Sequence, residues 1–327
     1  MGNKDVRLYE HITIDKKTAQ KLFSQYDNKI ELTNLTLIPE GMSTSNYIVD
    51  IKNSSKKYLL KIYPEGGGNS AIEAASYSYA KQYVNVPNIH LFDNSKKIYN
   101  NPYVIMDYIE GMSLKEYIIK NKKFPNKIAY DIGSKLALLH RREYKNRGLL
   151  NKNLDIKKNL PPITDLHEQF LNGIPGTHIN SKIKNELLES IDKNKELLKK
   201  LDTTFVYSHG DFYPANILID NKDNSVWFID FEYSLSAPIY YDIGKFFRDR
   251  AYMDKYGDKS TYDNFIRGYN EHAKNKVSDD WIKISRLADM TGMLSLINKE
   301  NPPMEWVKGI EDALKRTLRI LRNEIEF

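Results

Sequence analysis

The 327-residue chain contains no cysteine and no long apolar run. The absence of cysteine excludes disulfides, thiolate metal sites and cysteine nucleophiles. No apolar stretch approaches the roughly 20 residues needed to span a bilayer. The N-terminal MGNKDVRLYEH lacks the apolar core of a signal peptide, and Val6 stands where a myristoylation signal needs Ser or Thr. We therefore expect a cytoplasmic protein without a membrane partner.

The chain also carries little excess charge. Its formal net charge is +6 at pH 7, and its lysines are interleaved with Asp, Glu and Asn in segments such as NSKIKNELLESIDKNKELLKK. Such interleaving is typical of solvated helix faces, and no basic-aromatic module is visible. We therefore expect no nucleic-acid partner, and either a monomer or a dimer. With 41% hydrophobic and 12% aromatic residues, the composition is that of a globular protein.

The first hundred residues predict a small antiparallel sheet with one helix packed on it. Runs rich in β-branched and aromatic residues are separated by turn sequences such as Pro39-Glu40-Gly41. The expected strands span 30–38, 45–51, 57–63, 89–92 and 103–107, the packed helix spans 70–84, and a leading helix spans 15–27.

From about residue 112 the sequence becomes helical, and 181–200 has the clearest helical spacing of apolar residues. The change falls at DYIEGMS (107–113), which we interpret as a hinge between two lobes, 1–107 and 108–327. The predicted fold class is α+β, with a small sheet lobe and a larger, mainly helical lobe. Further helices are expected at 113–120, 126–141, 239–256, 260–271, 278–297 and 303–323.

The most informative segment is SHGDFYPANILID, followed by VWFIDFEYS. It sets His209, Asp211 and Asn216 in an H-x-D-x-x-x-x-N array, with Asp230 fourteen positions after Asn216. Transfer of a γ-phosphoryl group needs a carboxylate to orient the attacking hydroxyl, and an amide oxygen and a second carboxylate to hold Mg²⁺. The pattern assigns Asp211 as catalytic base and Asn216 and Asp230 as metal ligands. A simple turn with a strand-end acid is the alternative, but the full ordered set favours phosphoryl transfer.

The segment IPEGMSTSNYIV places a glycine-containing turn between two expected strands. Its N–H groups and the hydroxyls of Ser43, Thr44 and Ser45 could cover nucleotide phosphates. The turn has neither the dinucleotide-binding glycine pattern nor the P-loop pattern. Read alone, it would be an ordinary hairpin.

Lys61 lies inside the apolar strand YLLKIY. It either points to solvent or, if its face lines a cleft, binds the α- and β-phosphates of a nucleotide. Glu73 on the next helix is its natural partner. Glu73 could instead complete a capping box with Ser70, but a kinase-type site needs an oriented lysine, so we favour the ion pair.

These segments together resemble the aminoglycoside phosphotransferase and choline kinase superfamily, whose fold is similar to that of eukaryotic protein kinases. The resemblance covers nearly the whole chain, and its most specific parts are SHGDFYPANIL and IDFEYSLSAPIYYDIGKFFR. The supporting matches are IPEGMSTSNYIV as nucleotide loop, LLKIY as lysine strand, AIEAASYSYA as glutamate helix, VIMDYIEGMSL as hinge and LALLHR as a large-lobe helix.

The resemblance implies a two-lobed protein-kinase-like fold, with a nucleotide-binding lobe at 1–107 and a catalytic and substrate-binding lobe at 108–327. It implies Mg²⁺ as cofactor and ATP or GTP as co-substrate. It also implies a hinge at which Met106, Asp107 and Tyr108 flank the adenine.

Two further residues receive structural roles from the resemblance. His209 would support the catalytic loop through hydrogen bonds, because Asp211 already fills the position of the base. Asp242, in YYDIGKFF, matches an acid that supports the large lobe, although it could equally be an N-cap or a surface acid.

The acceptor is less defined. Asp-Phe-Glu-Tyr-Ser resembles choline and ethanolamine kinases, whereas APIYYDIGKFFR is more similar to bacterial antibiotic phosphotransferases. Both classes take hydroxylated cations, so we expect an acidic pocket supplied by Glu232, Asp249 and Glu110, each of which could instead be a surface or helix-pairing acid. An aromatic patch could enclose a quaternary ammonium or simply be core; its members are Tyr233, Tyr240, Tyr241, Phe246 and Phe247.

The leading hypothesis is an ATP- or GTP-dependent small-molecule O-phosphotransferase with an aminoglycoside-like antibiotic as acceptor, acting in antibiotic resistance. The alternative is a choline, ethanolamine or other metabolic kinase. A third possibility is a kinase-like binding or spore-coat protein without turnover. It fits poorly, because the lysine, the base and both metal ligands are present.

Overall fold

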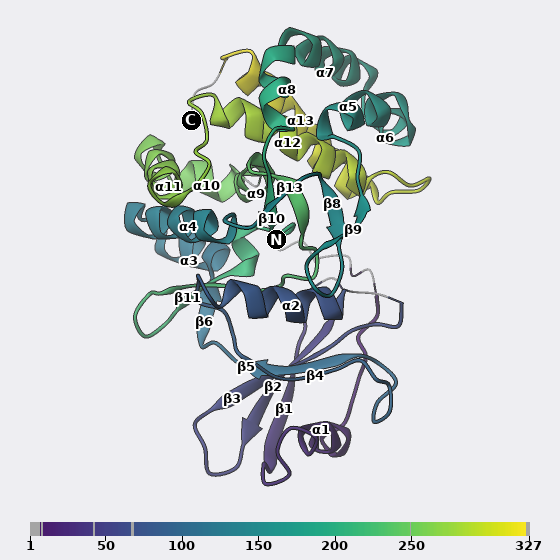
Figure 1. Cartoon of the computed structure of the whole chain (residues 1–327), viewed down its shortest axis with the longest axis vertical. Helices are drawn as coiled ribbons and strands as arrows, with labels where there is room; N and C mark the ends of the chain where they lie inside the picture. Colours follow the sequence, from purple (N-terminus) through teal and green to yellow (C-terminus); the bar gives the residue numbers. More distant parts are fainter. Residues whose placement is uncertain (1–6, 8, 42, 67–68, 249, 325–327) are drawn as a thin grey trace.

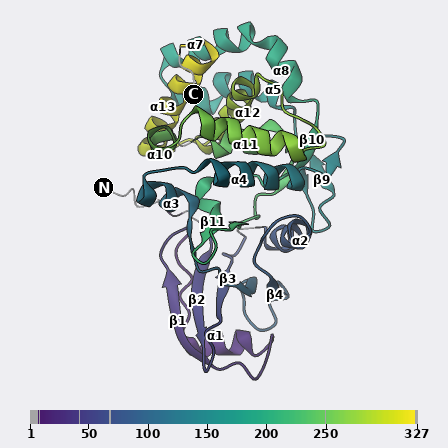
Figure 2. The same ribbon diagram turned by 90° about the vertical axis from the view of Figure 1, so that its left-hand side faces the viewer.

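The computed structural model describes residues 7, 9–41, 43–66, 69–248 and 250–324, and it has two lobes (Figure 1). The small lobe contains a five-stranded antiparallel sheet with strand order β1-β2-β3-β5-β4. One helix, α2, lies between this sheet and the large lobe, and α1 lies at the opposite end (Figures 1 and 2). The elements are α1 (Lys16–Phe23), β1 (Leu32–Ile38), β2 (Ser45–Ile51), β3 (Lys57–Ile62), α2 (Ser70–Ala80), β4 (Ile89–Asp93) and β5 (Tyr103–Asp107).

The leading helix forms for local reasons that the sequence shows. Asp15 is its N-cap, and the Asp15 side chain accepts a hydrogen bond from the Thr18 N–H. The apolar face predicted for this helix, Ala19, Leu22 and Phe23, is fully buried against the sheet. Burial of this face fixes the helix to the small lobe.

The large lobe is mainly helical and also contains two small antiparallel sheets, with strand orders β7-β10-β13-β8-β9 and β12-β11-β6. The predicted α+β fold with a sheet lobe and a larger helical lobe is confirmed. The helices are α3 (Leu114–Asn121), α4 (Asn126–Leu139), α5 (Ile163–Asn172), α6 (Ile174–His178), α7 (Ser181–Lys193), α8 (Lys195–Leu201), α9 (Tyr240–Phe246), α10 (Arg250–Tyr256), α11 (Lys259–His272), α12 (Trp281–Leu296) and α13 (Met304–Leu321). The strands are β6 (Gly111–Ser113), β7 (Glu143–Tyr144), β8 (Gly148–Leu150), β9 (Ile156–Asn159), β10 (Phe205–Ser208), β11 (Ile217–Asp220), β12 (Val226–Phe228) and β13 (Leu235–Pro238).

Two helices predicted as continuous are interrupted. The expected helix 181–200 breaks at Asn194, whose side-chain amide donates to the Ser190 carbonyl at 2.8 Å and whose backbone leaves the helical region. The expected helix 239–256 ends at Phe246, and α10 begins again at Arg250. Within the described ranges, no helix combines the length and apolar character needed to cross a membrane.

The chain passes between the lobes after β5. This strand ends at Asp107, and β6 already pairs with β11 in the large lobe. The segment after β12 also contacts α2 and the residue before it. The Asn69 side chain, just before the helix, donates to the Glu232 carbonyl at 3.1 Å, and the Tyr77 hydroxyl, on the helix, accepts from the Asp230 N–H at 3.1 Å. The segment that carries Asp230 is therefore held against the small lobe.

Candidate active site

An ion pair on Lys61 joins the two lobes. The Nζ of Lys61, on β3, is 2.8 Å from both carboxylate oxygens of Glu73 on α2 and 2.7 Å from Oδ1 of Asp230. The Tyr63 hydroxyl donates a further bond of 2.6 Å to Glu73. Burial works to lower the pKa of Lys61, but the carboxylates of Asp230 and Glu73 raise it well above its usual value, so the ammonium stays charged. The structure thus brings together the predicted partners Lys61 and Glu73 and adds Asp230 to them.

Glu73 does not form the capping box that was the alternative use of its side chain. The helix begins at Ser70, its N-cap is Asn69, and the Asn69 side chain makes no capping bond. The Glu73 carboxylate is fully buried and bonded to Lys61 and Tyr63 instead.

The loop after β10 carries the predicted base and one predicted metal ligand. The Nδ2 of Asn216 donates to the main-chain oxygen of Asp211 at 2.9 Å and to its Oδ2 at 2.8 Å. These bonds use the amide N–H groups and leave the Oδ1 oxygen of Asn216 as the atom that could bind a cation. Oδ1 of Asp211 is 2.6 Å from Nζ of Lys245 on α9. Burial works to raise the pKa of Asp211, but Lys245 outweighs it and the pKa is lowered, so Asp211 is a carboxylate at neutral pH.

Asp242 supports the main chain of this loop. It is fully buried on α9 and accepts hydrogen bonds from the N–H groups of His209 at 2.7 Å and Gly210 at 3.0 Å. Its Oδ2 is also 3.2 Å from Nε2 of His140. At Gly210 φ is +80°, and a Cβ there would come within 2.0 Å of the Tyr233 carbonyl, so only glycine fits.

Both ring nitrogens of His209 contact main-chain atoms. Nε2 is 2.9 Å from the Ile229 carbonyl, and Nδ1 accepts from the Asp211 N–H at 3.3 Å. Burial lowers the pKa of His209, so the ring is neutral. His209 therefore ties the loop to the segment before Asp230, and neither ring nitrogen is directed at a substrate.

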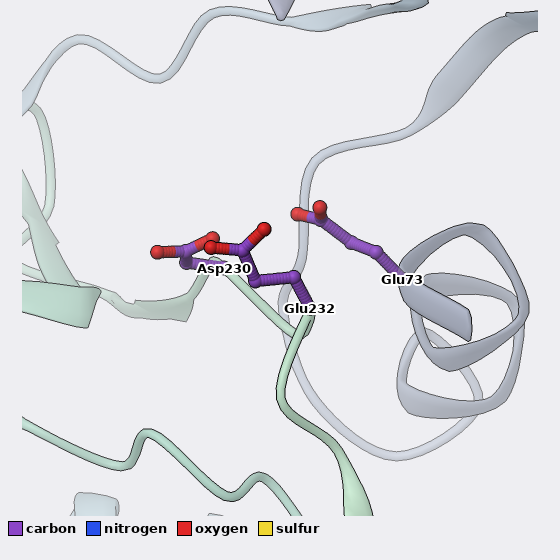
Figure 3. Close-up of side chains that lie close together, drawn as sticks. All are labelled: Glu73, Asp230 and Glu232. Atoms are coloured by element: carbon purple, nitrogen blue, oxygen red, sulfur yellow. The ribbon is translucent and has the colours of Figure 1, made fainter. Parts of the chain in front are cut away.

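Asp230 adopts an uncommon backbone conformation, with φ of 68°. The left-handed region is costly for most residues, and Asp is among the few that enter it. Figure 3 shows the Asp230 and Glu232 carboxylates from one segment and that of Glu73 from α2 lying close together. One ligand oxygen from each of the three lies within 4.8 Å of the others, a separation that suits a shared cation.

Glu232 is a buried acid for which the described part of the chain shows no ion pair. It is 3% exposed, and among the described residues its Oε2 has no hydrogen-bond partner. Burial, together with the negative charges of Asp230 and Glu73, raises the pKa of Glu232 to about 8, although Lys61 acts in the opposite direction. Glu232 is therefore largely protonated at neutral pH in the metal-free protein.

Replacing Glu232 by glutamine should change how stability depends on pH. The carboxyl loses its proton near pH 4.5 in the unfolded chain and near pH 8 in the folded protein, so the folded state binds more protons between these values. The free energy of unfolding of the wild type should therefore fall across this window relative to Glu232→Gln, by up to about 1.4 kcal/mol per pH unit. Urea unfolding of both metal-free proteins measures the difference, and parallel pH curves would contradict the protonated state.

The predicted nucleotide loop lies between the lobes. The Ser43 hydroxyl is 3.3 Å from the Tyr233 hydroxyl of the large lobe, whereas Ser45 Oγ accepts from the Ile12 N–H at 2.8 Å. Thr44 is buried between them. Of the three hydroxyl side chains, Ser43 is directed toward the large lobe and Ser45 supports the N-terminal segment.

Of the predicted hinge residues, Met106 and Asp107 are the last two residues of β5, and Tyr108 follows the strand. The Met106 side chain is buried, the Asp107 N–H donates to the Asn88 carbonyl at 3.0 Å, and the Tyr108 N–H donates to the Lys57 carbonyl at 3.4 Å. These two N–H groups are thus used within the protein. Recognition of adenine at this hinge stays a prediction.

The acids expected to bind the acceptor lie in different environments. Glu110 is half exposed and lies 3.7 Å from Lys57, at the hinge. Glu232 faces the Lys61 cluster, and Asp249 lies outside the described residues. Much of the aromatic patch is core: Phe246 and Phe247 are buried and contact each other at a ring-centroid distance of 4.8 Å.

Two basic residues that the sequence motifs do not point to, Lys245 and Arg248, lie near Asp211 in the structure. Lys245 contacts the predicted base, and Arg248 makes hydrogen bonds of 3.0 and 3.1 Å from Nε to the carboxylate of Asp289 on α12. The three-residue spacing of Asp242 and Lys245 is the signal that could have found Lys245, because it sets the two side chains on one face of α9. Arg248 lies beyond the end of that helix.

Comparison with known proteins identifies the family. A model of the phosphotransferase enzyme family matches residues 34–279. Ethanolamine kinase 1 of Homo sapiens is 32% identical over 115 residues, 34% of this chain and 24% of that protein. Probable choline kinase 2 of Arabidopsis thaliana is 22% identical over 306 residues, 86% of this chain and 80% of that protein.

Solved structures share the fold. A thermostable mutant of the aminoglycoside phosphotransferase APH(4)-Ia, in ternary complex with AMP-PNP and hygromycin B, aligns over 92% of this chain and 98% of its own with a TM-score of 0.64 and 11% identity. The match to the human kinase spans only about a quarter of that protein, whereas the family model covers most of the present chain. The chain belongs to the phosphotransferase enzyme family.

Proposed function

We propose that the protein is a small-molecule kinase that transfers the γ-phosphoryl group of ATP or GTP to a hydroxyl group. The observation that carries the proposal is the convergence of Lys61, Asp230 and the Asp211–Asn216 pair from the two lobes. A lysine on a carboxylate pair and a carboxylate beside an amide are the groups that phosphoryl transfer requires. On this proposal residues 1–107 form the nucleotide-binding lobe and 108–327 the catalytic lobe.

Magnesium would be held by Oδ1 of Asn216 and the carboxylate of Asp230. The oxygen donors suit this ion, and the unpartnered Oε2 of Glu232 offers a third ligand atom nearby. When bound, the ion compensates the charge of the nucleotide phosphates. Lys61 and the loop at Ser43 would contact those phosphates from the small lobe.

The residues of the large lobe would position the acceptor. Asp211 accepts a hydrogen bond from the acceptor hydroxyl and turns its oxygen toward the γ-phosphorus, a task that suits an ionised carboxylate of low pKa. Asp242 and His209 keep the loop in place through the bonds described above. These groups position the reactants and supply little covalent chemistry.

For the acceptor we rank amino alcohols of the ethanolamine and choline type first. The support is the sequence similarity to kinases named for these substrates, including 32% identity to the human ethanolamine kinase. Aminoglycosides rank second, supported by the segment APIYYDIGKFFR and its resemblance to antibiotic phosphotransferases. This order reverses the one that the sequence alone suggested.

An acceptor screen tests the proposal. The purified protein with Mg²⁺ and ATP or GTP should phosphorylate ethanolamine or choline, and the product should be lost when Mg²⁺ is chelated. Product formation is followed by mass spectrometry across ethanolamine, choline, thiamine, aminoglycosides and macrolides. Success with an aminoglycoside and failure with both amino alcohols would reverse the ranking. Absence of Mg²⁺-dependent nucleotide turnover with every acceptor, water included, would leave the kinase-like binding protein as the better description.

A further inference from the structure

Lys245 contacts the predicted base Asp211, and the proposed kinase function gives this lysine no part in the transfer step. It lies one helical turn after Asp242 on α9. Its Nζ is 2.6 Å from Oδ1 of Asp211 and donates to the Gly210 carbonyl at 3.2 Å. A lysine that touches both the side chain and the backbone of a catalytic loop is either a structural support or part of the chemistry.

The donor count of the ammonium group separates these roles. A lysine ammonium carries three N–H donors. Two are used by Asp211 and Gly210, and the described part of the chain supplies no acceptor for the third. The side chain keeps 19% of its surface exposed, so the group can be reached by a ligand. One strong donor is therefore left over beside the base.

The position of this donor matches the path of the transferred group. An acceptor hydroxyl bonded to Asp211 lies about 2.6–3.2 Å from the carboxylate, and the attacked phosphorus lies about 3–3.5 Å further on. A cation in contact with the same carboxylate is thus within reach of the phosphoryl oxygens. Lys61 cannot take this place while it is bonded to Glu73 and Asp230.

We propose that Lys245 is a catalytic residue that donates its third N–H to an oxygen of the phosphoryl group during transfer, while its other bonds hold Asp211. The inference rests on the proposed kinase function. In the step, the acceptor oxygen forms a bond to the γ-phosphorus and the bond from that phosphorus to the β,γ-bridging oxygen breaks. Its electron pair stays on the nucleoside diphosphate, and the hydroxyl proton passes to Asp211. Lys245 stabilises the negative charge on the oxygens of the group in flight.

The test compares Lys245→Met with Lys245→Arg and with Lys135→Met as the matched control. Lys135 has the same 19% side-chain exposure and an equally short contact, 2.6 Å to Asp131, but lies on α4. Water serves as acceptor, so that Mg²⁺-dependent ATP hydrolysis is measured without knowledge of the natural substrate. We expect kcat of Lys245→Met to fall by about 10²- to 10³-fold. The KM for ATP should change little, Lys245→Arg should recover much of the rate, and Lys135→Met should match the wild type.

Binding measurements exclude a purely structural effect. Lys245→Met should bind Mg·ADP as the wild type does but bind poorly to Mg·ADP with aluminium fluoride, a mimic of the phosphoryl group in transfer. The proposal is overturned if kcat of Lys245→Met is unchanged, or if Mg·ADP binding and thermal stability fall together with the rate and arginine restores none of it. Wild-type protein without Mg²⁺-dependent nucleotide turnover, both with water and with every acceptor of the screen, would overturn the kinase function itself and this inference with it. Active wild type with an equally active Lys245→Met overturns only the role of Lys245.

Discussion

Lys61→Met should abolish phosphoryl transfer and also destabilise the protein by about 3–5 kcal/mol. The substitution removes the ammonium that contacts both Glu73 and Asp230, and Glu73 is fully buried. Desolvated carboxylates without a cation repel each other and must take up protons or open the site to water. Urea unfolding gives the loss of stability, and binding of a fluorescent ATP analogue reports the nucleotide site.

Two variants make this result specific. Lys57→Met removes a lysine from the same strand whose side chain is 40% exposed and 3.7 Å from Glu110, so it should cost less than about 1 kcal/mol. The double variant Lys61→Met/Glu73→Gln also removes the negative charge of Glu73, which lacks its cation when Lys61 is replaced. It should regain part of the stability without regaining activity. If Lys61→Met unfolds at the same urea concentration as the wild type, the buried ion pair does not contribute the predicted free energy of unfolding.

Asp211→Asn should lower kcat by about 10³-fold with little change in Mg·ADP binding. The amide has nearly the same shape as the carboxylate and can still accept the bond from Asn216, which donates to Oδ2 at 2.8 Å. It cannot accept the proton of the acceptor hydroxyl, and it loses the charge that attracts Lys245. Steady-state kinetics with the acceptor found in the screen, and calorimetry with Mg·ADP, measure the two quantities.

Asp131→Asn is the control for this variant, because Asp131 also pairs with a lysine at 2.6 Å but lies on α4. Its kcat should equal that of the wild type. A rate for Asp211→Asn within a few-fold of the wild type would remove Asp211 from the chemistry, and with it the interpretation of the HGDFYPAN segment.

Much of the site was predictable because its chemistry lies in short segments. The order of His209, Asp211, Asn216 and Asp230 along the chain reflects one loop and the turn after the following hairpin, so local spacing carries it. Lys61 could be predicted as a site residue because a lysine in an apolar strand is seldom buried without a charged partner. The sheet of the small lobe could be predicted from its runs of strand-forming residues and the turn residues between them.

Other features were not predictable from local patterns. The contact between Lys245 and Asp211 depends on how α9 packs under the loop, which is tertiary information. The protonated state of Glu232 results from burial beside its neighbour Asp230 and beside Glu73, which comes from a distant part of the sequence. The strands and helices between 143 and 178 are short, and weak periodicity over so few residues does not distinguish them from loop.

Helix α9 has a consequence for how substitutions act at a distance. Through Asp242 it holds the main chain of the catalytic loop, and through Lys245 it holds the side chain of Asp211. Its own position is set by α12, which approaches so closely that a Cβ on Gly244 would lie 2.3 Å from the Ser285 carbonyl. The orientation of the Asp211 side chain therefore depends on the contact between α9 and α12. Substitutions that abolish activity should therefore be found in the catalytic loop and also among the residues of the α9–α12 contact, which do not touch a substrate.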